Sequence, residues 1–439
     1  MNDKLKQPGR VRPRPILAIV RHPLLLAATL AAAVAGWSGP AGAVTLGELV
    51  RQAAFNNPSA LARQRAAEAA AEGVSAARWQ FFPTPSVSVE RAGLTSSRDL
   101  SYNGDDTVVT LRLQQTLWSG GRLSAQLEQA GHNQQSAEEG LREQRFRLAE
   151  QVISQYSLWV RSDLAAAANQ KNLKALEDFL AQSLRREKEG AAAKVDVTLV
   201  RGRRDQALTD LLGAKAGRQS ARLQLEQLVG LPLSDDELRA DIEKQPVDDD
   251  LALLTEAMLD GSPLLKRLRA DAKVQEAAIK IRSASYWPEV YARLEHQRGN
   301  FSVRNQPSNN RAFVGMQMQL GAGLSLGSEV AAAEGRYQSA VLAVDAARLE
   351  LVSQIAATFT EYQQALARAG NLDQVGLSAE EVLASYTRQY LSGRRSWLDV
   401  MNAVREVVQT DLQKADVTAT IIADGRKLQL WAYGLGQVR

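Results

Sequence analysis

The stretch Arg388–Asn402, RQYLSGRRSWLDVMN, places a glycine, two arginines and a tryptophan inside one of the longest helical patterns of the chain. A similar arrangement occurs earlier, in Arg186–Val200, REKEGAAAKVDVTLV. In each stretch a glycine, Gly190 or Gly393, is followed a few residues later by Asp-Val. The chain therefore contains one structural unit twice.

The repetition extends along most of the sequence. Matching residues include Leu46 and Leu251, Pro58 and Pro263, Glu90 and Glu295, Leu148 and Leu351, and Gln206 and Gln409. Internal repeats indicate a duplicated supersecondary unit. We predict a first repeat over residues 44–231 and a second over residues 251–436, joined by an acidic linker with two prolines over residues 232–250.

The first 43 residues have the pattern of a signal peptide. They combine six basic residues and a single acidic one with an apolar segment, and end in Ala-Gly-Ala before Val44. The remainder carries 47 basic and 48 acidic residues, so the pI of about 9.2 gives no reason to expect a nucleic-acid partner. There is no cysteine, which excludes disulfides, thiolate metal sites and a lipidated N-terminal cysteine. We expect export to the periplasm or outer membrane.

Each repeat begins with two short helical patterns, followed by a pair of alternating apolar and polar segments. These strand pairs are expected at about residues 85–118 and 289–326. Strands of about ten residues with one apolar face are typical of a transmembrane β-barrel. Two soluble hairpins packed on helices remain the alternative at this point.

Long helical patterns follow each strand pair. Residues 123–189 and 329–391 keep helical spacing and contain no proline, and residues 195–229 and 398–430 form the returning segments. A helix of this length needs a coiled-coil partner. We therefore predict two long helical hairpins, with tips near residues 190–196 and 390–399. Four strands cannot close a barrel alone, so a dimer with eight strands or a trimer with twelve is needed.

This order of elements resembles the TolC family of outer-membrane efflux and secretion channels. The resemblance rests on the duplicated order, on both tips, and on TLWSGGRL, Thr116–Leu123, whose Gly120 and Gly121 match the family's strand-to-helix turn. It implies an α+β membrane protein: a homotrimer with a 12-stranded β-barrel in outer-membrane lipid, continuous with a periplasmic α-helical barrel. It also implies a channel with no enzymatic activity and no cofactor.

The resemblance also implies roles for residues at the tips. Gly190 and Gly393 match the hairpin turns. Tyr390 and Arg395 match family residues that bond to the other hairpin near the aspartate equivalent to Asp196 and keep the pore closed. The family's luminal constriction carries two aspartates, which correspond here to Asp399 and Asn402. The amide would halve the number of carboxylates at the constriction.

Other chemistry is poorly supported by the residues. GLSLG, Gly323–Gly327, matches a nucleophile elbow by letter, but the only histidines are His22, His132 and His296, so no downstream histidine is available. Two histidines after the leader and no cysteine indicate no metal site.

The expected partners are an inner-membrane ABC transporter, or a proton-driven pump, and a periplasmic adaptor. The absent lipidation cysteine favours type I secretion of a protein such as a large surface adhesin. The alternative within the channel class is a drug or metal efflux pump, and the alternative of another class is a periplasmic coiled-coil scaffold or adaptor.

Overall fold

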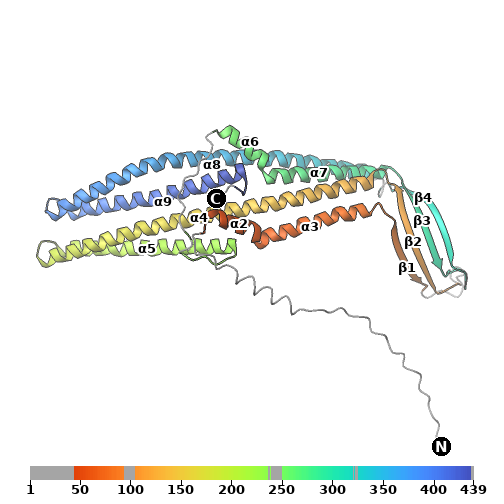
Figure 1. The fold of residues 1–439 in the computed structure, drawn as a ribbon, viewed down its shortest axis with the longest axis horizontal. Helices are drawn as coiled ribbons and strands as arrows, with labels where there is room; N and C mark the ends of the chain where they lie inside the picture. Colours follow the sequence, from red (N-terminus) through yellow and green to blue (C-terminus); the bar gives the residue numbers. More distant parts are fainter. Residues whose placement is uncertain are drawn as a thin grey trace, which may run out of the picture. The chain divides into compact units, whose positions relative to one another are not determined.

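We analysed a computed structural model of the chain, which describes residues 44–92, 104–235, 238, 250–319, 321 and 325–436. The predicted signal peptide, residues 1–43, and most of the predicted linker lie outside the described residues. Within residues 44–436, the sheet lies at one end of the long helices and the turns of both helical hairpins lie at the other (Figure 1).

Both repeats have the same order of elements. The first contains α2 (Leu46–Asn56), α3 (Pro58–Trp79), β1 (Thr84–Arg91), β2 (Thr107–Trp118), α4 (Arg122–Lys188) and α5 (Lys194–Val229). The second contains α6 (Leu251–Gly261), α7 (Pro263–Ser283), a short 3-10 turn (Ala284–Tyr286), β3 (Glu289–Arg298), β4 (Asn309–Gln317), α8 (Leu326–Leu391) and α9 (Trp397–Tyr433). The predicted second strand pair extended to about residue 326, whereas β4 ends at Gln317, before Gly321 with its φ of 81°.

Local side chains explain where the short helices begin. Thr45 and Glu48 form a capping box at the start of α2, which satisfies two backbone N–H groups. Asn57 and Ser262 cap α3 and α7, and each is followed by a proline at the first helical position. Proline suits that position because its missing N–H has no partner inside the helix.

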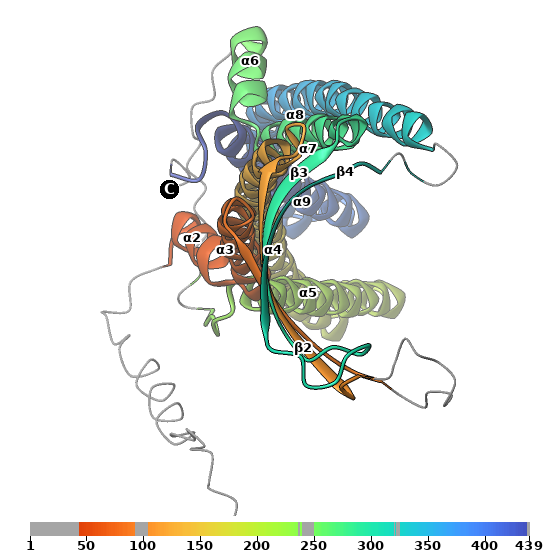
Figure 2. The ribbon, with the colours of Figure 1, turned by 90° about the vertical axis from the view of Figure 1, so that its right-hand side faces the viewer.

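The four strands form one antiparallel sheet in the order β1-β2-β3-β4. The register places Val87 opposite Leu111, Leu111 opposite His296, and His296 opposite Asn310. The sheet is strongly curved when seen end-on (Figure 2). β1 and β4 are its two edges, and within the described residues each pairs with a strand on one side only.

The long helices pack as two antiparallel pairs, α4 with α5 and α8 with α9, and α4 also packs against α9. At ~1.5 Å per residue, the 67 residues of α4 extend over ~100 Å. Apolar side chains are buried at intervals along this length, near α2 and near α6 as well as at the tips. In the described part of the chain, no helix is both long and apolar enough to cross a membrane.

Asp424 lies on the buried side of α9. We expect its carboxyl group to make the stability of the folded protein depend on pH. Burial, then the nearby Glu361 carboxylate, raises the pKa of Asp424 from 3.8 to about 6. The folded state therefore binds this proton more tightly than the unfolded state, and stability falls as pH rises from about 4 to about 6. Asp424→Asn is expected to raise the melting temperature, by an amount that grows over this interval and is constant above it.

Thermal melts of wild type and variant followed by circular dichroism across this pH range would measure the difference. Asp416→Asn, on the exposed side of the same helix, is the matched control and should give no gain in stability. A pH-independent difference for Asp424→Asn would contradict the assignment.

Candidate functional site

Both hairpin tips use the same turn. Gly190 and Gly393 have φ values of 72° and 75°, in the left-handed region that favours glycine. After α4, the Gly190 N–H donates to the Glu187 carbonyl and the Ala191 N–H to the Arg186 carbonyl. After α8, Gly393 and Arg394 donate in the same way to Tyr390 and Gln389. Each tip is therefore a Schellman motif that ends the descending helix and reverses the chain.

A shared apolar cluster joins the two tips. We call it the tip core; its buried residues include Leu173, Leu176, Phe179, Val200, Tyr390, Val400, Met401 and Val404, drawn from all four long helices. Trp397, the tryptophan of the stretch Arg388–Asn402, packs against this cluster. The two hairpins of one chain are thus held together at their tips by buried apolar surface.

Arg186 makes the most direct polar contact between the two hairpins at the tips. Its Nη1 donates to the Tyr390 carbonyl oxygen at 3.1 Å, and its guanidinium lies 4.7 Å from the centre of the Tyr390 ring. The centres of the Tyr390 and Phe179 rings lie 5.1 Å apart, and Tyr390 is only 7% exposed. A cation is favourable here because the C-terminal end of α8 carries partial negative charge and the ring face attracts cations.

Sequence reasoning missed Arg186 although it lies four residues before Gly190. Arg186 and Tyr390 are far apart in the sequence, and the cationic last turn of α4 also contains Arg185 and Lys188. Only the side-chain contacts across to Tyr390 on α8 distinguish Arg186 from these neighbours.

The structure does not bring Arg395 and Asp196 together within one chain. The Arg395 side chain turns back onto its own hairpin: Nη1 lies 3.5 Å from Asp399 Oδ2 and the guanidinium lies 3.9 Å from the centre of the Tyr386 ring. Asp196 is in the first turn of α5 and has no ion pair in the described part of the chain. The contacts of Tyr390 with the first hairpin are made by its ring and its backbone carbonyl oxygen, which meet Phe179 and Arg186 of α4.

Asp399 and Asn402 lie one turn apart on α9. Asp399 belongs to the first turn, where Ser396 accepts a hydrogen bond from its N–H at 3.3 Å. Its carboxylate is paired with Arg395, and the side-chain amide oxygen Oδ1 of Asn402 accepts from Arg405 Nη2 at 3.2 Å. Both positions therefore have a cation beside them. These cations weaken the negative potential of this face, in addition to the effect of an amide in place of a carboxylate at position 402.

Ion pairs also link the hairpins above the tips. Lys171 on α4 contacts Glu380 on α8 at 2.6 Å and Asp411 on α9 at 3.7 Å, and its hydrogen bond to Glu380 raises the pKa of Lys171. Arg161 contacts Asp416 at 2.9 Å. These groups are largely exposed, and exposed pairs contribute only about 0 to 1 kcal/mol each. The tip core and Arg186 are expected to matter more.

The turn from β2 into α4 requires glycine for two reasons. Gly120 and Gly121 have φ values of 60° and 90°. A Cβ on Gly120 would lie 2.7 Å from Trp287 Cβ and 2.9 Å from the Ala284 carbonyl, whereas one on Gly121 would meet nothing within 4 Å. The Trp287 ring also packs edge-on against the Trp118 ring, with 6.1 Å between the ring centres. Gly120 thus allows β2 and the start of β3 to approach each other where strands become helices.

Gly120→Ala is expected to reduce the yield of heat-resistant assembly several-fold, because the clash adds to the roughly 1–2 kcal/mol of left-handed strain. Gly121→Ala carries the strain without the clash and should have a smaller effect. Gly131→Ala, an uncrowded position inside α4, should be neutral. Electrophoresis of unheated and heated samples would compare the three variants, and equal losses at positions 120 and 121 would contradict the role of the clash.

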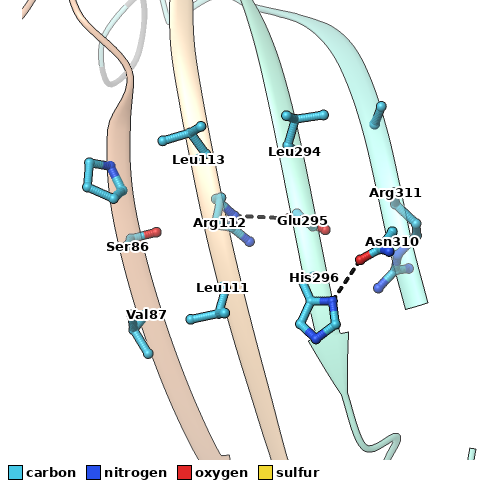
Figure 3. Close-up of a pocket in the computed structure, with 12 residues that line it drawn as sticks. Ser86, Val87, Leu111, Arg112, Leu113, Leu294, Glu295, His296, Asn310 and Arg311 are labelled. Carbon is cyan, nitrogen blue, oxygen red and sulfur yellow. Dashed lines mark hydrogen bonds and ion pairs between the residues drawn. The ribbon is translucent and has the colours of Figure 1, made fainter. Parts of the chain in front are cut away.

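The two faces of the sheet differ in chemistry. One face carries apolar side chains, among them Val87, Leu111, Leu113 and Leu294 (Figure 3). On the same part of the sheet, His296 Nδ1 lies 2.7 Å from the amide oxygen Oδ1 of Asn310. The other face carries Glu295, which pairs with Arg112 at 2.9 Å and Arg293 at 3.1 Å. An apolar face suits lipid, and a face of paired charges suits water.

Enzyme-like features are not assembled. Ser325 of the GLSLG stretch donates to Glu329 at 3.0 Å, while residues 323 and 324 lie outside the described residues. Among the described residues no group of three or more His, Cys, Asp or Glu side chains could hold a metal ion.

Taken together, a sheet with two unpaired edges, continuous with paired helical hairpins whose tips meet at the far end, is the architecture of one subunit of an outer-membrane duct. Residues 49–231 and 254–430 match the family described as outer membrane efflux protein, and these ranges cover most of the chain. The protein therefore belongs to this family. It is an outer-membrane efflux channel and not an enzyme, and the predicted membership of the TolC family is confirmed.

Several solved structures share this fold. The outer membrane protein VceC from Vibrio cholerae is 19% identical with a TM-score of 0.76, over 89% of this chain and 96% of that one. The CmeC outer membrane channel of Campylobacter jejuni is 14% identical with a TM-score of 0.76, over 89% and 86%. The open state of the MtrE channel of Neisseria gonorrhoeae is 17% identical with a TM-score of 0.73, over 89% of each chain. None of the curated proteins compared with this chain matches it.

Family membership decides between the two classes of protein that the sequence left open. The match extends over both repeats, including the strands as well as the helical hairpins. The chain is therefore a channel subunit and not a periplasmic scaffold or adaptor.

Proposed function

We propose that this channel is the exit duct of a tripartite export system, in which a homotrimer in the outer membrane works with an inner-membrane transporter and a periplasmic adaptor. The observation that carries the proposal is the position of the tip core, which joins both hairpins of a chain at the end opposite the sheet. An energised partner can act there on both hairpins at once, so the chain itself needs no catalytic site.

The sheet edges support the proposed closed ring of copies, for which we propose three members. β1 and β4 leave backbone N–H and C=O groups unpaired, and such edges are not tolerated in lipid. Pairing β1 of one copy with β4 of the next removes all edges once the ring closes. Three copies give twelve strands, an even number in the range of bacterial barrels.

We propose that the tips form a gate with two kinds of contact. Within a chain, Arg186 holds the end of α8 through Tyr390. Between copies, Asp196 is proposed to receive a cation such as Arg395, since Asp196 has no ion pair within its own chain in the described structure. Asp399 and Asn402 are proposed to line the constriction above the gate.

The proposed cargo is a protein, exported with an ABC transporter by type I secretion; a large surface adhesin is one such cargo. This proposal rests on the cysteine-free sequence and on the tip stretch YLSGRRSWLDVMNA, Tyr390–Ala403. Disrupting the gene should remove a specific protein from the cell surface or medium, and leave the minimal inhibitory concentrations of antibiotics and metal salts unchanged.

Purification of the channel with its inner-membrane partner after cross-linking provides the second readout. An ABC transporter supports protein secretion. A proton-driven pump, together with raised sensitivity to drugs or metals, would overturn the cargo proposal and support small-molecule efflux through the same duct.

A further inference from the structure

The tips carry exposed cations that form no ion pair with any of the described residues. Five lysine and arginine side chains within about two turns of the hairpin glycines are exposed and have no ion pair in the described structure. We call them the basic tip surface: Arg185, Lys188, Lys194, Arg388 and Arg394. Arg186 and Arg395 are excluded because they are engaged with Tyr390 and Asp399.

The charge of this region cannot be cancelled by pairing the tips of identical copies with one another. Residues 182–200 and 385–403 contain seven lysines and arginines against four aspartates and glutamates, a net charge of +3 per chain. Each added copy adds the same charge, so contacts between tips redistribute ion pairs and leave the sum positive. Neutralisation of the tips therefore requires acidic groups from outside these two segments.

Exposed apolar side chains lie among these cations. Val195, Leu391 and Leu398 are 62%, 57% and 53% exposed, and flank the two turns. A surface that combines apolar side chains with a rim of charge is typical of protein interfaces. A purely ionic ligand would not use the apolar part.

We infer that the basic tip surface docks the acidic surface of a periplasmic protein partner, one that presents aspartate and glutamate side chains around an apolar contact. This inference rests on the proposed function, in which a periplasmic partner engages the tips. Charges at the rim of an interface chiefly accelerate encounter and select the partner, and salt weakens their effect. The sign of the charge therefore specifies which partners the duct accepts.

The test uses the full-length protein purified in detergent and two synthetic amphipathic helical peptides of identical apolar face, one with glutamate and one with lysine on the polar face. Association is followed by surface plasmon resonance at low and at physiological salt. The glutamate peptide should bind, with a rate that falls as salt is added, and the lysine peptide should not.

Charge reversal locates the site. Lys194→Glu with Arg394→Glu changes one exposed cation in each tip, and glutamate in the first turn of α5 is compatible with its helix dipole. Lys215→Glu with Lys273→Glu is the matched control, because both residues are exposed, unpaired in the described structure and far from the tips. The tip variant should slow association about tenfold and the control less than twofold.

Three results would overturn the inference: equal effects of the two double variants, equal binding of both peptides, or binding of phosphatidylglycerol-containing vesicles without binding of the glutamate peptide. The last result would assign the surface to anionic lipid. Conductance in planar bilayers is measured on the same samples. A conducting channel that fails the peptide test refutes the docking surface alone. Absence of conductance both in wild type and in an Arg186→Ala variant, which lacks the contact proposed to hold the tips closed, refutes the proposed function itself.

Discussion

Replacing Arg186 with alanine is expected to raise the resting conductance of the channel more than any other single change at the tips. The substitution removes a charge-assisted hydrogen bond and a cation–π contact on the end of α8. If each of three copies loses roughly 1.5 kcal/mol, the ratio of open to closed channels rises about a thousandfold. Single-channel recordings in planar bilayers would measure the open probability directly.

Neighbouring substitutions separate this contact from a general loss of charge. Arg185→Ala removes an exposed cation one residue away and should leave the open probability unchanged. Arg395→Ala should have a smaller effect than Arg186→Ala, because any pair that Arg395 forms with Asp196 of another copy replaces its partly exposed pair with Asp399. Tyr390→Phe keeps both the ring and the carbonyl and should stay closed.

The resemblance to the TolC family suggests a competing expectation, namely that Tyr390→Phe together with Arg395→Ser opens the gate. The Tyr390 hydroxyl makes no hydrogen bond in the described structure, so its loss should matter little within one chain. Strong opening by Tyr390→Phe, with Arg186→Ala remaining closed, would show that contacts between copies control the gate instead.

Asn402→Asp is expected to make block of the channel by trivalent cations at least about tenfold tighter. In a trimer the substitution raises the number of carboxylates at the proposed constriction from three to six, on a face that Asp399 already shares at i, i+3. Wild type should be blocked weakly, because Arg395 and Arg405 lie beside the two positions.

Block is measured as the concentration of hexamminecobalt that halves the conductance, applied from the side of the helical tips. Glu406→Asp retains the charge of a nearby residue on α9 and serves as the control for an altered helix. Identical block of wild type and Asn402→Asp would show that these side chains do not line the conducting path.

Much of the fold could be predicted because it depends on local patterns that occur twice. Gly190 and Gly393 are expected at helix ends from their position alone, and the structure gives both the same turn. Alternation of apolar and polar residues identifies the strands, because one face of the sheet must be apolar. The predicted strand pair ends at about residue 326, whereas β4 ends at Gln317; residues 320 and 322–324 lie outside the described residues.

The contacts at the tips were less predictable, since they depend on which helices lie side by side. Arg185 and Lys188 carry the same charge as Arg186, and only the position of Arg186 on α4 brings its side chain to Tyr390 of α8. Arg395 matches a family motif, yet its guanidinium is drawn back to Tyr386 and Asp399 by residues specific to this hairpin. Motif position alone does not identify the partner of a long side chain.

The central claim is that the duct opens where α4 and α8 meet at the tips, and cross-linking tests it most directly. The chain has no cysteine, so Arg186→Cys with Tyr390→Cys introduces the only two thiols per copy. This variant lacks the contact and should conduct at rest. A cleavable bis-maleimide that joins the two thiols should close the channel, and cleavage of the linker should reopen it. Conductance that is low before cross-linking, or that is unchanged by it, would contradict the account.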